Sequence, residues 1–199
     1  SRLDAVILSH PDRDHYGGLL DLGSNVHISR LFLPARSAGE AAFDSLLGRL
    51  ERRGTRVQLA GAGARLTGFG FDVEFVTPSP ETRRLFERGM LTTNAVSLVT
   101  RMRHNGQVML FTGDLDMPDR MSLEPVWLVK SAHHGSRKGN PPWLYRRLQP
   151  EYVVTMGRFP TRAGLENWLS GLGAKDINTR RDGAVVLRFS GSGPVFSSR

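Results

Sequence analysis

The sequence predicts an α+β fold in which a mixed sheet, or two stacked sheets, is covered by helices. Short apolar segments alternate with longer amphipathic ones, which is typical of layered folds. No segment repeats at a period of about 20 to 50 residues, which argues against a repeat architecture. No linker longer than a loop interrupts the 199 residues, so we expect a single domain over 1–199.

The predicted strands are short, apolar and partly β-branched. The first ends at His10, and the second is stopped by Pro34. Asn105-Gly106 lies between two apolar segments, which is a strong hairpin signal. The predicted strands are 3–9, 26–33, 56–59, 64–67, 71–77, 95–103, 107–112, 126–130, 152–155 and 184–189.

Four segments have the pattern of helices. The clearest is 38–53, whose apolar stripe consists of Ala41, Leu46, Leu47 and Leu50. The glycine that follows this segment ends the helix. The other predicted helices are 81–88, 142–148 and 163–172.

The composition indicates a globular chain, because 39% of the residues are hydrophobic and 23% charged. No apolar segment reaches the roughly 18 to 20 residues that span a bilayer. The chain has no signal-peptide pattern and opens directly on an apolar segment. We therefore expect a fragment of a larger protein.

Cysteine is absent, so a metal would be bound by His, Asp, Glu or water. Such ligands favour zinc, manganese or magnesium. The formal net charge is +8, and all but three of the 27 cationic residues are Arg. A basic surface attracts polyanions, although a general preference for Arg explains the same composition.

The first chemical motif follows the first predicted strand and reads SHPDRDHYGG. It places His10, Asp12, Asp14 and His15 within six residues. Two carboxylates beside two imidazoles are costly without a cation, so the motif predicts a metal site. His10 and Asp12 can face one metal, and Asp14 and His15 a neighbouring one. The alternative is a polar turn that caps a short segment, 19–22.

The second motif is LFTGD, where an apolar strand ends at Gly113-Asp114. Asp114 can bridge two metals, as two-metal hydrolases require. Alone, this pattern equally fits an ordinary turn. Its weight comes from the other motifs.

The third motif, SAHHGSRK, follows the predicted strand 126–130. Adjacent histidines point to different sides, so we expect one of His133 and His134 to be a ligand. The other can orient the substrate or donate a proton. The three residues after the glycine are candidates for phosphate binding, and a solvated loop is the alternative. They are Ser136, Arg137 and Lys138.

The remaining histidines and most aromatics carry no such signal. His27 lies in a predicted strand and His104 at a hairpin turn, and we expect both to be structural. Among the aromatics, only Trp143 and Tyr145 are candidates for substrate contact. Core positions are expected for Phe32, Phe69, Phe71, Phe75, Phe111 and Trp127.

Together, the motifs resemble the metallo-β-lactamase superfamily. SHPDRDHYGGL, NAVSLV, LFTGDL and HHGSR narrow the resemblance to the C-terminal β-lactamase-like domain of ComEC-type DNA-uptake channels. The similarity runs from Leu3 to about Phe189. It implies an αββα sandwich with its metals at one edge of two facing sheets.

The resemblance also implies site residues. Metal ligands would be His10, Asp12, Asp14, His15 and Asp114, with His133 or His134 as a ligand or catalytic group. Asn94 and Ser97 would stand roughly where other members place a further histidine, as substrate-binding residues.

The sequence departs from the family pattern at both ends. The early Asp-Val-Gly-Gln-Gly-Asp and Asp-Thr-Gly patterns are absent, so we expect the first strands of one sheet to be missing. The late Asn-x-x-Gly-His-Pro pattern is replaced by GRFPTR without a histidine. Arg158 or Arg162 of that segment can face a phosphate instead.

The resulting hypothesis is a two-metal deoxyribonuclease that uses Mn²⁺ or Zn²⁺, or Mg²⁺. It would degrade the non-transported DNA strand during natural transformation. The implied partners are DNA, the membrane channel domain of the same parent chain and other competence proteins. The domain would lie on the extracytoplasmic face of the bacterial cytoplasmic membrane. The alternatives are a catalytically weak DNA-binding or structural domain of the channel, or a hydrolase of another ester.

Overall fold

The computed structural model describes residues 1–36, 40–68, 70–116, 121, 123–157, 163–190 and 193–198. The chain divides into two compact units. The N-terminal unit comprises Ser1–Ala64 and Phe75–Val99, and the C-terminal unit comprises Arg65–Glu74 and Thr100–Arg199. Within the described ranges, no helix has the length and apolar character needed to cross a bilayer. The expectation of a single domain over 1–199 stays a prediction.

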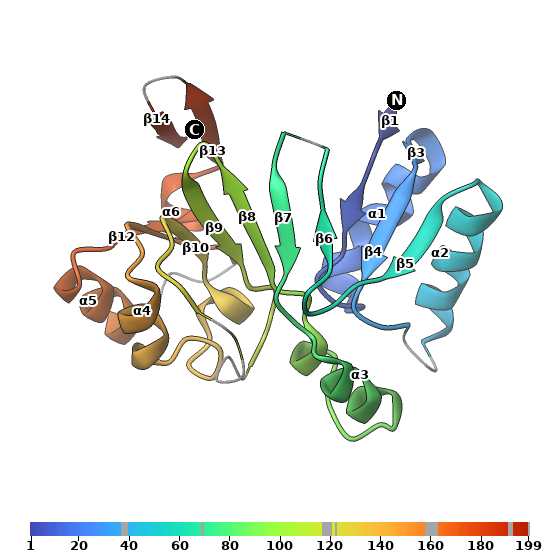
Figure 1. Cartoon of the computed structure of the whole chain (residues 1–199), viewed down its shortest axis with the longest axis horizontal. Helices are drawn as coiled ribbons and strands as arrows, with labels where there is room; N and C mark the ends of the chain where they lie inside the picture. Colours follow the sequence, from blue (N-terminus) through green and yellow to red (C-terminus); the bar gives the residue numbers. More distant parts are fainter. Residues whose placement is uncertain are drawn as a thin grey trace. The chain divides into compact units, whose positions relative to one another are not determined.

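The N-terminal unit is built on parallel strands joined by helices (Figure 1). Its three-stranded sheet has the order β2-β4-β5, and a separate parallel pair joins β1 and β3. Parallel neighbours need crossover connections, which here contain the helices α1 and α2. The elements are β1 (Arg2–Leu3), β2 (Val6–Ile7), α1 (Arg13–Asn25), β3 (His27–Ile28), β4 (Arg30–Leu33), α2 (Ala41–Arg52), β5 (Arg56–Leu59), α3 (Pro80–Glu87) and the 3-10 helix η1 (Asn94–Val96).

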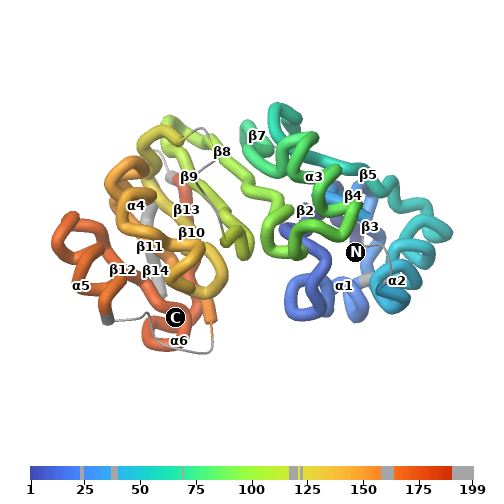
Figure 2. Tube along the Cα trace, turned by 90° about the horizontal axis from the view of Figure 1, so that it is seen from below, coloured from blue at the N-terminus to red at the C-terminus, as the bar shows by residue number. Residues whose placement is uncertain are grey.

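The core of this unit lies between its strands and the helices α1 and α2, which run side by side in Figure 2. α2 buries Phe43, Leu46, Leu47 and Leu50, an i, i+3, i+4, i+7 stripe. Each such side chain contributes about 1.5–3 kcal/mol. The predicted stripe was wrong at Ala41, which is exposed, because Phe43 occupies the first buried position.

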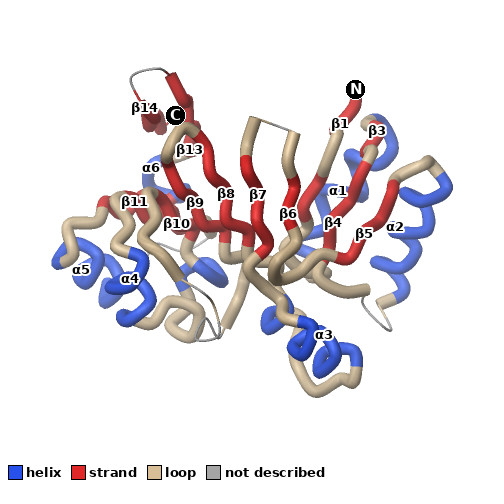
Figure 3. Tube along the Cα trace, in the orientation of Figure 1, coloured by secondary structure: helices blue, strands red, loops and turns tan. Residues whose placement is uncertain are grey.

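The C-terminal unit contains a seven-stranded mixed sheet of order β12-β11-β10-β9-β8-β7-β6 (Figure 3). Two antiparallel hairpins, β6-β7 and β8-β9, precede the parallel series β9 to β12. The elements are β6 (Arg65–Leu66), β7 (Asp72–Phe75), β8 (Thr100–His104), β9 (Gln107–Phe111), β10 (Leu128–Lys130), η3 (Ala132–Gly135), α4 (Pro142–Leu148), β11 (Tyr152–Thr155), α5 (Ala163–Gly171), β12 (Lys175–Asn178), α6 (Thr179–Asp182), β13 (Val185–Ser190) and β14 (Gly193–Ser198).

The central strands of this sheet are apolar on both faces. One face packs Met109, Leu128 and Val154 against apolar side chains of β13, among them Val185, Leu187 and Phe189. The alternate residues Leu110, Val129 and Val153 are also buried. This explains why β9 to β11 are nearly continuous apolar segments in the sequence.

An ion-pair network joins the neighbouring strands β7 and β8. The Glu74 carboxylate accepts hydrogen bonds from Arg101 at 3.1 Å and Arg103 at 3.2 Å. Both arginines also pair with Glu124. Burial alone would raise the pKa of Glu74, but the hydrogen bonds from the two arginines outweigh it and lower that pKa.

The structure corrects several predicted boundaries. The predicted strands 3–9 and 26–33 are each divided in two, because β1 pairs with β3 whereas β2 pairs with β4. The predicted strand 95–103 begins only at Thr100. The helices α1 and α6 and the strands β12 and β14 were missed. β12 reads KDIN, a polar edge strand without an apolar signal. Residues 38 and 39 of the predicted helix 38–53, and Phe69, lie outside the described residues.

Candidate functional site

The first motif sits where the sheet of the N-terminal unit passes into α1. Leu8 N–H donates to the Phe32 carbonyl at 2.9 Å, so the chain stays in register up to the motif. α1 then begins at Arg13 with Asp12 at its N-cap. The carbonyl of Asp12 accepts hydrogen bonds from the N–H groups of His15 and Tyr16. Asp14 and His15 therefore lie in the first turn of a helix that the sequence analysis did not predict.

The carboxylate of Asp12 does not cap this helix. Its Oδ2 lies 3.5 Å from Nε2 of His10, which is 1% exposed. The carboxylate of Asp14 lies 3.8 Å from Nε2 of His15. The structure thus brings together all four predicted ligands of the first motif as two imidazole–carboxylate pairs.

Ser9, which the sequence did not single out, aligns the two imidazoles. Its Oγ lies 3.2 Å from Nδ1 of His10 and 3.0 Å from Nδ1 of His15. The ring centroids are 4.0 Å apart. Because one hydroxyl engages the Nδ1 atom of both rings, both Nε2 atoms face the carboxylates. Such support from behind the ligands commonly orients imidazoles at metal sites.

Tyr16 anchors the start of α1 to the core. Its ring packs on Phe43 with centroids 5.0 Å apart, and its hydroxyl donates to Glu40 at 3.0 Å. Burial, together with this hydrogen bond, raises the pKa of Tyr16. The hydroxyl therefore stays protonated and holds the helix turn that carries Asp14 and His15.

The Asn94–Ser97 segment lies beside the first motif in the same unit. Leu98 N–H donates to the Ser9 carbonyl at 2.6 Å. The Thr77 hydroxyl donates to the Ser97 carbonyl at 2.6 Å and accepts from Val99 N–H at 3.0 Å. The Ser97 side chain is fully buried, which favours a supporting role. Its predicted contact with substrate stays a prediction.

In the C-terminal unit, Asp114 lies at the turn that follows β9. Gly113 has a φ of +55°, which glycine adopts without a steric penalty. The ammonium of Lys130 donates to the carbonyls of Gly113 at 2.9 Å and Ser131 at 3.2 Å. It also lies 3.7 Å from the Asp114 carboxylate. Burial lowers the pKa of Lys130, while Asp114 acts in the opposite direction.

The adjacent histidines of the third motif have left-handed backbones, with φ of 44° at His133 and 52° at His134. Their ring centroids are 6.2 Å apart and the ring planes are inclined at 67°. Nδ1 of His134 lies 2.8 Å from the Met156 carbonyl, and its Nε2 lies 3.4 Å from Oδ2 of Asp114. Since a carbonyl only accepts, Nδ1 donates to it, and Nε2 is the nitrogen that faces Asp114 and is placed to meet a metal.

His133 has a different partner. Its Nδ1 lies 2.8 Å from the carboxylate of Asp116. A carboxylate in this position orients the imidazole. The two histidines thus have different partners, Asp116 for His133 and Asp114 with Met156 for His134.

Asn140 fastens the loop that carries both histidines. Its Oδ1 accepts from Ala132 N–H at 3.0 Å and from the Tyr145 hydroxyl at 2.7 Å. Its Nδ2 donates to the carbonyls of Ala132 and Ser136, each at 2.7 Å. Burial raises the pKa of Tyr145. Because Tyr145 is fully buried, the prediction that it contacts substrate was wrong; it is part of this support.

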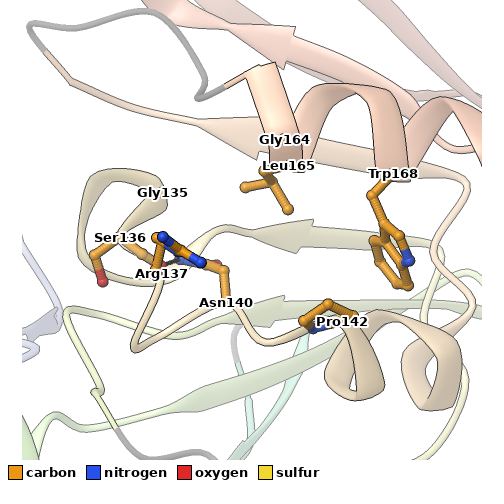
Figure 4. A pocket seen from close by; sticks show the side chains of 8 residues that line it. All are labelled: Gly135, Ser136, Arg137, Asn140, Pro142, Gly164, Leu165 and Trp168. Carbon is orange, nitrogen blue, oxygen red and sulfur yellow. Dashed lines mark hydrogen bonds between the residues drawn. The ribbon is translucent and has the colours of Figure 1, made fainter.

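Ser136, Arg137 and Lys138 follow the two histidines. The Ser136 hydroxyl accepts from Gly139 N–H at 3.2 Å, so it also shapes the turn. Arg137 and Lys138 are exposed. Arg137 and Ser136 line a cavity of about 540 Å³ (Figure 4). Arg158 and Arg162, the other candidates for a phosphate contact, lie outside the described residues.

The sequence analysis missed Lys130, Asp116 and Asn140 as well as Ser9. Two of them could have been found from the sequence. Lys130 is a charged residue at the end of an apolar strand, and Asp116 follows the Gly-Asp turn by two residues. His104, predicted to be structural, packs against Phe71 at 4.5 Å and meets Phe189 edge-on at 4.7 Å between ring centroids, which supports that prediction.

No protein-family model matches the chain. Competence protein ComA of Neisseria gonorrhoeae is 30% identical over 211 residues, an alignment that covers the whole chain and 27% of ComA. ComE operon protein 3 of Bacillus subtilis (strain 168) is 27% identical, over 77% of the chain and 20% of that protein. The chain thus spans about a quarter of these relatives or less.

Solved structures show the same fold at low sequence identity. The metallo-β-lactamase fold protein YhfI from Bacillus subtilis is 16% identical, with a TM-score of 0.54 over 88% of this chain and 74% of YhfI. Zn²⁺-bound PqqB from Methylobacterium extorquens is 11% identical, with a TM-score of 0.55 over 88% of this chain and 71% of PqqB.

The fold and its motifs define a metallo-β-lactamase-like α+β domain, and the predicted fold class is confirmed. Within that class, the two competence relatives confirm the resemblance that the motifs indicated. The chain is a β-lactamase-like domain of the ComEC type.

Proposed function

We propose that this domain is a divalent-metal-dependent phosphodiesterase that degrades the non-transported DNA strand during natural transformation. The observation that carries the proposal is the pairing of each imidazole in the first motif with a carboxylate, aligned by Ser9. The competence relatives supply the biological setting, and the formal charge of +8 suits a polyanionic substrate.

The donor set fits hard or borderline divalent cations. Nitrogen and carboxylate oxygen ligands without thiolate suit Mn²⁺, Zn²⁺ and Mg²⁺. In the N-terminal unit, each imidazole Nε2 faces a carboxylate. In the C-terminal unit, Nε2 of His134 faces Asp114. We propose as metal ligands His10, Asp12, Asp14, His15, Asp114 and His134, with His133 as the alternative ligand that the sequence suggested.

A bound divalent ion would lower the pKa of water and neutralise charge on a phosphoryl group. His133, oriented by Asp116, would donate a proton to the oxygen that leaves phosphorus. Arg137 and Lys138 would hold the phosphate through charged hydrogen bonds. Asn94 and Ser97 would contact the substrate next to the first motif.

The setting follows from the relatives and is part of the proposal. We propose that the domain belongs to a larger DNA-uptake protein, with a membrane channel domain in the same parent chain. It would face the outside of the cytoplasmic membrane, where incoming DNA arrives. Other competence proteins would bring the DNA to it.

The test is a cleavage assay on plasmid and single-stranded oligonucleotides. Metal-stripped protein receives Mn²⁺, Mg²⁺ or Zn²⁺, and Asp14→Ala is compared with Asp21→Ala, an exposed carboxylate on the same helix. We expect metal-dependent cutting that Asp14→Ala abolishes and Asp21→Ala retains. Calorimetric titration of Mn²⁺ should show weaker binding only for Asp14→Ala.

Cleavage that survives Asp14→Ala in a clean preparation would contradict the metal-site assignment. A folded protein that binds DNA but never cuts it would overturn the nuclease proposal. The domain would then be a DNA-binding or structural part of the channel. Turnover of a small ester without cutting of DNA would assign it to another class of hydrolase.

A further inference from the structure

A cavity of about 540 Å³ lies in the C-terminal unit, between the loop after His134 and the helices α4 and α5 (Figure 4). Its volume falls within the range of about 300–1,000 Å³ that is typical of small-molecule sites. No residue proposed above as a metal ligand lines it. It shares Arg137 with the phosphate contact proposed above, and the rest of its lining has no role in the proposed metal site.

The two ends of this cavity differ in character. Ser136, Arg137 and Asn140 line one end, and Figure 4 shows the Arg137 guanidinium there. Pro142, Leu165 and Trp168 line the other end, where the indole stands away from the guanidinium. An anion fits the first end because Arg offers a planar set of donors. A flat apolar ring fits the second end.

The walls of the cavity are held in place by neighbouring side chains. Asn140 is fixed by its bonds to Ala132 and Tyr145. The ring centroids of Trp168 and Tyr145 are 5.8 Å apart. The guanidinium of Arg146 lies 5.9 Å from the ring centroid of Trp168. A cation over an indole adds attraction and order. A preformed wall lowers the entropic cost of binding.

We propose that this cavity binds one nucleoside 5′-phosphate unit of a DNA strand. The phosphate lies at Arg137 and Ser136, and the base packs against Trp168, Leu165 and Pro142. Aromatic side chains bind bases with little sequence preference, which suits a domain that degrades DNA of any sequence. The choice of DNA as the polymer rests on the proposed function, whereas the nucleotide chemistry rests on the cavity.

The test is binding of 2′-deoxyadenosine 5′-monophosphate to the full chain in EDTA, measured by calorimetry. Arg137→Gln should weaken binding about 10-fold or more, because a charged hydrogen bond is lost. Trp168→Leu should weaken it about 5- to 100-fold through lost stacking. The controls Arg147→Gln and Leu172→Ala change exposed residues that do not line the cavity, and both should bind like the parent.

Two partial ligands separate the ends of the cavity. Deoxyadenosine lacks the phosphate, so its binding should respond to Trp168→Leu and not to Arg137→Gln. Deoxyribose 5-phosphate lacks the base and should show the reverse. If Trp168→Leu is poorly folded, Trp168→Phe replaces it in the test. This variant keeps an aromatic ring and should retain most of the affinity of the parent.

Absence of nucleotide binding to the folded parent chain at millimolar concentrations would overturn the proposal. Equal weakening by the control variants would do the same. The outcome is independent of the nuclease test, since EDTA removes the metal. Nucleotide binding without DNA cleavage would support the cavity as a nucleotide site and refute the proposed nuclease function. DNA cleavage without nucleotide binding would support the nuclease function and refute the nucleotide site.

Discussion

Replacing Asn140 by alanine should loosen the loop that carries His133 and His134. The Asn140 side chain takes part in four hydrogen bonds among the described residues. At about 1 kcal/mol each, their loss costs about 4 kcal/mol. The two histidines have left-handed backbones, each strained by roughly 1–2 kcal/mol. Relaxation of that strain recovers part of the cost, so we expect a net loss of about 2–3 kcal/mol.

Urea unfolding measures the free energy of unfolding. The rate of hydrogen exchange in the peptide 132–139 measures how often the loop opens. Asn140→Ala should raise exchange in this peptide. Tyr145→Phe removes one of the four bonds and should cost about 1 kcal/mol. Asn167→Ala, which changes an exposed residue on α5, serves as the control. A change of less than about 0.5 kcal/mol in Asn140→Ala, with unchanged exchange, would refute the reasoning.

Two further predictions concern other supports of the fold and the site. Glu74→Gln should cost about 1–3 kcal/mol at neutral pH, because Arg101 and Arg103 lose a charged partner. Since the folded pKa of Glu74 is below its ordinary 4.5, the stabilisation is present above that pH and is lost as the pH falls through the folded value. Acid unfolding curves should therefore be steeper for the parent than for Glu74→Gln, and equal slopes would contradict this. Ser9→Ala should weaken Mn²⁺ binding about 10- to 100-fold through loss of its contacts with His10 and His15, and an unchanged calorimetric titration would count against a metal-orienting role.

Local chemistry made part of the fold predictable. The hairpin at Asn105-Gly106, the helix 142–148 and the strand 152–155 follow from turn residues and apolar patterns of short range. β12 was not predictable in this way. Its polar residues form a strand because a buried neighbour, β11, offers its free edge.

The candidate site divides along the same line. The sequence by itself was enough to predict a cation site and its candidate ligands, because closely spaced imidazoles and carboxylates favour a bound cation. It could not show that Asp14 and His15 lie in the first turn of a helix, that Ser9 contacts both imidazoles, or which residues orient His133 and His134. The contacts of the two histidines depend on residues distant in the sequence, Asp116 for His133 and Met156 for His134. Only the tertiary structure decides them, because a backbone carbonyl or amide far along the chain leaves no mark in the local pattern of side chains.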